Sequence, residues 1–238
     1  MAVGFAAFGH QGRWKTLNIL NMVTTTTNYI RKVDPPALPQ ATDDYARSYQ
    51  DQTNNVLRLF FNRLTASLNA ILSVNGGANI QFPYGAFQSS VDQTAVVNTA
   101  TAMTFNVTDY SNAVSVVSNS KITVTTAGIY NLQWSGQFEN ADTQLHDASV
   151  WIRVNGADVV GSNSLVSVPN KHGGVNGHTI AAWNYFVELQ ANQYVELWWS
   201  TDDTQVSLQY YAAGTGPTRP TTASVIATLT FVSALPGA

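Results

Sequence analysis

The sequence contains no cysteine, and only 11% of its 238 residues carry a charge. The absence of cysteine excludes disulfide bonds, thiol catalysis and cysteine-bound zinc. Charged residues make up about 25% of an average chain, so we expect a polar surface with few charged side chains. The net charge of −3 argues against a nucleic-acid partner. No apolar run is long enough to span a membrane, and the N-terminal residues do not read as a signal peptide. We therefore expect a product that is made and first retained in a cytoplasm.

The motifs of catalysis are also missing from the sequence. It has no glycine-rich phosphate loop, no nucleophile elbow and no HExxH pair. Glycoside hydrolysis requires two carboxylates at a set separation, and nothing marks such a pair among Glu139, Glu188 and Glu196. We expect no enzymatic activity, no catalytic residue and no cofactor.

Histidines and aspartates raise the question of a metal. His146-Asp147, His172 and His178 would bind one only if their loops converged, and spacing alone does not show convergence. The Asp202-Asp203 pair suggests calcium, but an acidic pair in a hairpin turn is ordinary. We therefore expect no metal site. Six residues remain as possible ligand contacts in loops: His146, Asp147, His172, His178, Tyr210 and Tyr211.

Composition divides the chain into three segments: 1–41, 42–79 and 80–238. Pro35, Pro36 and Pro39 favour extended chain at the end of the first segment. That segment is either a floppy tail or an extended anchor that becomes ordered against a partner. Large apolar side chains favour the anchor. They are Trp14, Leu17, Ile19, Leu20, Tyr29 and Ile30.

The second segment predicts a helix over 42–73. Thr42-Asp43-Asp44 supplies N-cap chemistry, and Asn75-Gly76-Gly77 supplies the stop. Residues spaced alternately three and four apart form a heptad seam. The seam consists of Gln50, Asn54, Leu57, Phe61, Leu64, Leu68 and Ile71. This pattern predicts a short trimeric stalk about 48 Å long at 1.5 Å per residue, although a helix that packs on another part of the chain remains the alternative.

The third segment alternates apolar and polar residues with period two, which predicts a mainly β domain, a sandwich or a barrel. We expect strands near 130–138, 150–154, 183–189, 195–199, 206–210 and 225–231. Some strands are apolar on both faces: Tyr194 and Trp198 oppose Leu197, and Ile180 and Phe186 oppose Trp183. A second apolar face predicts contact with another copy of the chain, and scattered surface aromatics are the alternative.

Several motifs resemble the C1q/TNF-like head domains. They are the Gly-x-Tyr strand at 127–132, the strand that ends in Asn-Gly at 150–156, the hairpin at 187–197, the aromatic final strand at 227–231, and Phe87 in the first strand. The chain departs from the pattern at Ala191-Asn192-Gln193, where the family often has Gly-Asp. The resemblance implies a ten-strand jelly roll that forms a homotrimer and binds ligands without catalysis.

Three further stretches, 82–88, 167–178 and 213–220, look like domains of bacteriophage fibres and decoration proteins. There a head follows a short helical coiled-coil stalk and an N-terminal virion anchor. The resemblance implies a virion protein, a trimeric tail fibre that contacts a host surface glycan or protein and attaches to the tail or baseplate. A head-decoration or cement fibre on the capsid is the alternative, and a secreted C1q-like lectin is a second one.

Overall fold

The computed structural model describes residues 33–41, 43–73 and 81–235. Contacts divide the chain into two units, Met1–Ile80 and Gln81–Ala238. The predicted helix stop at 75–77 lies outside the described residues. The predicted anchor also lies outside them, with Trp14, Leu17, Ile19, Leu20, Tyr29 and Ile30.

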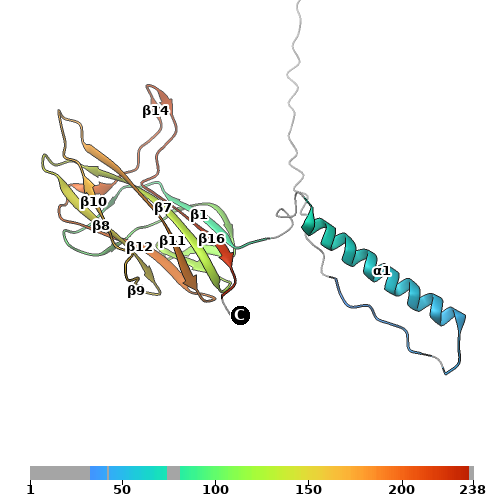
Figure 1. Ribbon diagram of the computed structural model, residues 1–238. Coiled ribbons are helices and arrows are strands. Elements are labelled where there is room, and N and C mark those ends of the chain that lie inside the picture. The colour runs from blue at the N-terminus through green and yellow to red at the C-terminus, as the bar shows by residue number, and fades with distance from the viewer. Residues whose placement is uncertain (1–32, 42, 74–80, 236–238) are drawn as a thin grey trace, which may run out of the picture. The chain divides into compact units, whose positions relative to one another are not determined.

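The described part of the first unit contains one helix, α1, from Arg47 to Leu72 (Figure 1). It begins five residues after the predicted start, so the predicted cap at Thr42-Asp43-Asp44 is wrong. Ala46 is the N-cap, with extended backbone and no side-chain hydrogen bond, and Asp43 and Asp44 form a bend before it. Aspartate competes with helical hydrogen bonds by bonding to nearby backbone, which favours such a bend. At 1.5 Å per residue the helix is about 39 Å long. Among the described residues, no helix has the length and apolarity needed to cross a membrane.

The second unit is built of antiparallel strands, as the period-two pattern predicted (Figure 1). The strands of four or more residues are β1 (Tyr84–Ser89), β4 (Val107–Asn112), β5 (Val114–Val117), β6 (Lys121–Val124), β7 (Gly128–Asn140), β8 (His146–Val154), β10 (Ser164–Val168), β11 (Gly177–Leu189), β12 (Tyr194–Thr201) and β16 (Val225–Ser233). The shorter ones are β2 (Gln93–Thr94), β3 (Thr101–Ala102), β9 (Ala157–Asp158), β13 (Val206–Leu208), β14 (Gly214–Thr215) and β15 (Thr218–Arg219).

The first seven-stranded sheet is organised around β7. Strand β11 pairs with the whole of one edge of β7, from Gly177 opposite Asn140 to Leu189 opposite Gly128. The other edge is shared by β16 and β13. The path then continues from β16 through β1 to β4, while β2 pairs with β13. Because β7 has partners along both edges, it is the central strand of this sheet.

The second seven-stranded sheet has the order β10-β8-β12-β6-β5, with β9 beside β8 and β3 beside β12. Strands β14 and β15 form a separate two-stranded hairpin. The chain passes from the first sheet to the second between β7 and β8 and returns between β10 and β11. The result is a β-sandwich-like domain whose connections are compatible with a jelly roll.

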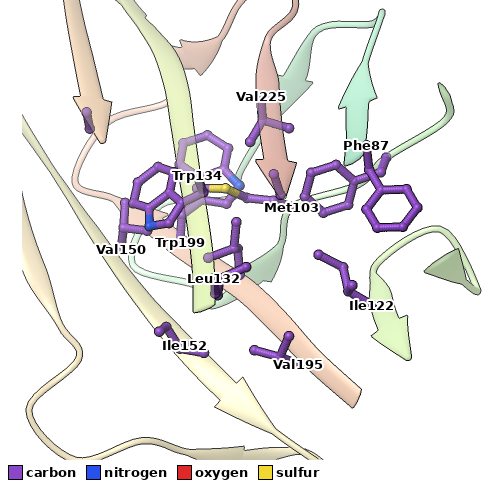
Figure 2. Packing of buried hydrophobic residues seen from close by; sticks show 14 of the residues in the cluster. Phe87, Met103, Ile122, Leu132, Trp134, Val150, Ile152, Val195, Trp199 and Val225 are labelled. Carbon is purple, nitrogen blue, oxygen red and sulfur yellow. The ribbon is translucent and has the colours of Figure 1, made fainter. Parts of the chain in front are cut away.

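The hydrophobic core lies between the two sheets, where alternate residues of each strand point inward. Leu132 and Trp134 of β7 lie near Val150, Ile152 and Trp199 of the other sheet (Figure 2). Phe138 and Trp199 meet edge to face across the core, with ring centroids 5.9 Å apart. These contacts hold the sheets face to face, which leaves turns, sheet edges and outer faces for interactions with other molecules.

Candidate functional site

The predicted stalk seam lies along α1, and none of its residues is buried by the described part of the chain. No described residue of the helix is buried. Phe61, Leu68 and Ile71 are exposed, and Leu57 and Leu64 are half-buried. The two polar seam residues pair within the helix, since Gln50 donates a hydrogen bond to Asn54 over 3.2 Å. The helix therefore presents an apolar stripe to solvent.

A second apolar face lies on β11, the edge strand of the first sheet. Ile180 and Phe186 point outward and are 68% and 65% exposed. The inward residues Val187 and Leu189 are buried in the core. Strand β11 is therefore apolar on both faces, as the sequence predicted, and its outer face has no cover within the described residues.

On strand β12, the outer aromatic residues Tyr194 and Trp198 are partly covered by side chains of the same chain. The guanidinium of Arg153 lies 3.8 Å from the ring centroid of Trp198, and the ammonium of Lys121 lies 4.7 Å from that of Tyr194. Cations over aromatic faces stabilise the stack electrostatically. Side chains of β8 and β6 thus cover these outer aromatic residues in part, and contact with another copy at β12 stays a prediction.

One polar cluster surrounds Glu139 near the end of β7. The Tyr211 hydroxyl donates a hydrogen bond to Glu139 Oε2 and lies 3.2 Å from His178 Nδ1. Asn176 donates to Glu139 Oε1 over 2.7 Å. Burial, together with the hydrogen bond and charge of Glu139, raises the pKa of Tyr211 well above its usual range. The cluster holds the start of β11 against the chain segment around Tyr211.

His172 and Tyr210 do not join this cluster. His172 is exposed in the β10–β11 loop, where its backbone pairs with Val175. The Tyr210 amide donates to Asp92 Oδ1 over 2.8 Å. Of the six predicted loop residues, only Tyr211 and His178 therefore meet at this place.

A second polar cluster surrounds His146, the first residue of β8. Its Nε2 lies 3.0 Å from Asp142 Oδ2 and 3.8 Å from Asp203 Oδ2, and its Nδ1 lies 3.3 Å from Asp202 Oδ1. The hydrogen bond that His146 donates to the Asp142 carboxylate raises the pKa of His146 and lowers the pKa of Asp142. His146 and the Asp202-Asp203 pair, which the sequence offered as separate metal sites, lie at one place.

The carboxylate of Asp147, a further predicted contact residue, turns away from His146. It accepts a hydrogen bond from Ser167 Oγ, while the Asp147 amide donates to Asp202 Oδ1 over 3.1 Å. Sequence reasoning missed Asp142, whose only signal is its place four residues before His146 across a turn. It also missed Glu139 and Asn176 as partners, because their meeting depends on strand register.

Comparison with protein-family models and with curated proteins found no match for this chain. The features that bear on function are the fold, the two apolar faces that the described residues leave uncovered, and the two polar clusters. Both clusters act as hydrogen-bond networks that fix turns. Within the described residues neither one places a serine or threonine hydroxyl beside a histidine base, so neither resembles a nucleophilic catalytic set.

Proposed function

We propose that this chain is a non-enzymatic structural protein of a bacteriophage virion, a trimeric fibre whose β head contacts the host surface. In this proposal α1 is the trimer stalk and residues 1–41 attach the fibre to the tail or baseplate. The observation that carries the proposal is the uncovered seam of α1.

A helix of this kind needs a partner. In proteins, most helical stability comes from packing an apolar face rather than from intrinsic propensity. Among the described residues, the face along Leu57, Phe61, Leu64 and Leu68 packs on no buried core. Parallel copies of α1 would bury these residues against one another at the axis of a short coiled coil.

The β head supports the same proposal. Of the sixteen described strands, ten have four or more residues, and five of these lie in each facing sheet. That arrangement is compatible with the ten-strand jelly roll that the resemblance implies. The exposed Ile180 and Phe186 on β11 add a second apolar face, which contact between heads would cover.

The first prediction is the mass of the assembly. Light scattering on the purified full chain should give about three times 25.7 kDa at micromolar concentration, because seam and head faces are both buried by trimerisation. A stable monomer under these conditions would contradict the stalk and the head arguments together.

The second prediction tests the seam with a matched pair of variants. Leu64→Asp places three carboxylates at the trimer axis, where desolvation and mutual repulsion oppose assembly. We expect this variant to lose trimer mass and helical circular dichroism while near-ultraviolet signals of the head persist. Leu59→Asp makes the same chemical change two positions from the seam residues Leu57 and Phe61, on the opposite side of the helix, where the side chain is exposed. It should leave the trimer intact, and equal effects of the two changes would show that the seam is misassigned.

A further inference from the structure

Three potential metal ligands converge at the turn end of the β domain. His146 Nε2, Asp142 and Asp203 each offer one donor atom, and all three lie within 4.8 Å of one another. Two ligands bound about 2.1 Å from one zinc ion at the tetrahedral angle are about 3.4 Å apart. The observed separations from Nε2, 3.0 Å to Asp142 and 3.8 Å to Asp203, lie on either side of that value.

The surrounding chain fixes these donors before any ion arrives. Asp203 uses Oδ1 to accept the Gln205 amide over 2.7 Å, which leaves Oδ2 facing the imidazole. The buried Thr201 holds the same turn, because its hydroxyl donates to the Asp203 carbonyl over 3.0 Å. The carboxylate of Asp142 accepts backbone hydrogen bonds from the residues that follow it. Little reorganisation is therefore needed for binding.

The other ring nitrogen of His146 has the partner that a metal-bound histidine requires. Histidine ligands almost always donate their second N–H to a carboxylate or carbonyl, which sets the tautomer and the ring orientation. Nδ1 of His146 lies 3.3 Å from Asp202 Oδ1, and that oxygen is itself fixed by the Asp147 amide. The His146 side chain is only 14% exposed. Its contacts with Asp142 and Asp202, rather than water, therefore orient the ring.

The charges around the imidazole also favour a cation. Carboxylate oxygens face both ring nitrogens, so a neutral imidazole with one N–H leaves one of them without a donor, whereas a cation at Nε2, either a proton or a metal ion, satisfies both. Among the described residues, neither Asp142 nor Asp203 forms an ion pair with lysine or arginine. A divalent cation at Nε2 would neutralise both carboxylates and leave Nδ1–H to donate to Asp202.

We propose that His146, Asp142 and Asp203 bind one divalent ion of the zinc class, with Asp202 as the positioning residue. A nitrogen donor beside two carboxylates suits borderline ions, whereas calcium and magnesium prefer oxygen ligands alone. The ion would clip the β7–β8 turn to the β12–β13 turn, both of which lead from one sheet to the other. All three donors come from one chain, so the site is independent of trimer formation.

The test uses the full chain after chelator treatment and titrates it calorimetrically with Zn²⁺ and separately with Ca²⁺. We expect one Zn²⁺ per chain at micromolar concentration, a higher melting temperature with Zn²⁺, and weaker Ca²⁺ binding. His146→Gln and Asp203→Asn should each weaken Zn²⁺ binding by at least about 100-fold, and Asp202→Asn by about 10–100-fold. His172→Gln, a change at an exposed loop histidine, is the matched control and should leave the affinity unchanged.

Three outcomes would overturn the site. They are no saturable Zn²⁺ binding, Zn²⁺ binding that His146→Gln and Asp203→Asn leave unchanged, and Ca²⁺ binding as tight as Zn²⁺ binding. Circular dichroism checks that the variants are folded. If they are not, the visible absorption of Co²⁺ bound to the unaltered chain decides, because nitrogen and carboxylate ligation changes it from the spectrum of the aqueous ion. An unchanged aqueous spectrum would also reject the site.

Discussion

Individual side chains cover part of the outer face of the second sheet. Arg153 is one of them, and it contacts both an aromatic ring and a carboxylate. Its guanidinium lies over the ring of Trp198, and its Nε donates to Asp158, which also accepts a hydrogen bond from Trp151. Hydrogen bonds from Arg153 and then Trp151 lower the pKa of Asp158. Next to this group the buried Glu196 accepts a hydrogen bond from Ser120 over 2.6 Å. Two of the eleven basic side chains, Arg153 and Lys121, thus lie over aromatic rings of this face.

Arg153→Ala should lower the free energy of unfolding by about 1–2 kcal/mol, because it removes a cation from a partly desolvated ring and exposes that ring. Arg153→Lys should recover part of the loss, since an ammonium keeps the charge but not the planar stack. Urea unfolding monitored by tryptophan fluorescence measures both. Arg219→Ala, at an exposed arginine in the β14–β15 hairpin, is the control. A loss as large in the control would mean that net charge, not the stack, is responsible.

At the scale of elements, the start of β11 depends on a close backbone approach. A Cβ added to Gly177 would lie 1.8 Å from the carbonyl oxygen of Pro169, just beyond the end of β10. No side chain fits there unless the backbone of one strand moves. The β10–β11 connection therefore returns to the sheet only because this position is glycine.

Gly177→Ala should accordingly cost about 2–4 kcal/mol of stability, since the clash is with backbone and cannot be relieved by a rotamer change. Gly216→Ala is the matched control, because a Cβ there meets no atom within 4 Å, and it should change stability by less than about 0.5 kcal/mol. Thermal melts of the two variants provide the comparison. Equal melting temperatures for the two variants would show that the β10–β11 loop moves to make room for the added Cβ at little cost.

The six strand regions predicted from the alternation are confirmed, whereas β4, β5, β6 and β10 were not predicted and the predicted helix start is wrong. Alternation fixes the inward and outward residues of β7, β11 and β16 without knowledge of their partners. The cap of α1 depended on local competition between Asp43, Asp44 and the backbone, where several starts differ little in energy. The cover over Trp198 was unpredictable for another reason, because Arg153 reaches it only through the register of β8 against β12.

At the scale of the whole molecule, the polar clusters depend on topology that no local pattern encodes. His146 and Asp203 are far apart in sequence and meet because β13 pairs with the end of β7, with Val206 opposite Asn140. The residue types could be read from the sequence, but His146 and the Asp202-Asp203 pair were considered as separate candidate sites in different loops. The same limit applies to Glu139 and Tyr211, whose hydrogen bond spans 72 positions.

The division into two units leads to a prediction about attachment. If the chain is the proposed virion fibre, a chain that begins at Thr42 keeps α1 and the β domain, so it should remain a soluble trimer and lose incorporation into virions. Sedimentation and particle composition measure these two properties. If the head binds a receptor, the shortened trimer should also compete with phage for adsorption, helped by three-fold avidity. A decoration protein would fold equally well and compete with nothing, and a shortened chain that still enters particles would place the anchor elsewhere.

The position of β16 has a consequence for the order of events during synthesis. This last strand lies between β7 and β1, and Ser224, immediately before it, bonds to the Ser89 carbonyl across 135 positions of sequence. At translation rates of about 5–20 residues per second, β7 waits roughly 5–20 s for this neighbour. High contact order slows folding to about milliseconds to seconds even after the chain is complete. During this interval the nascent β domain has an open, apolar sheet edge to which chaperones have access. A chain that terminates before β16 lacks the strand between β7 and β1 and cannot complete the sheet.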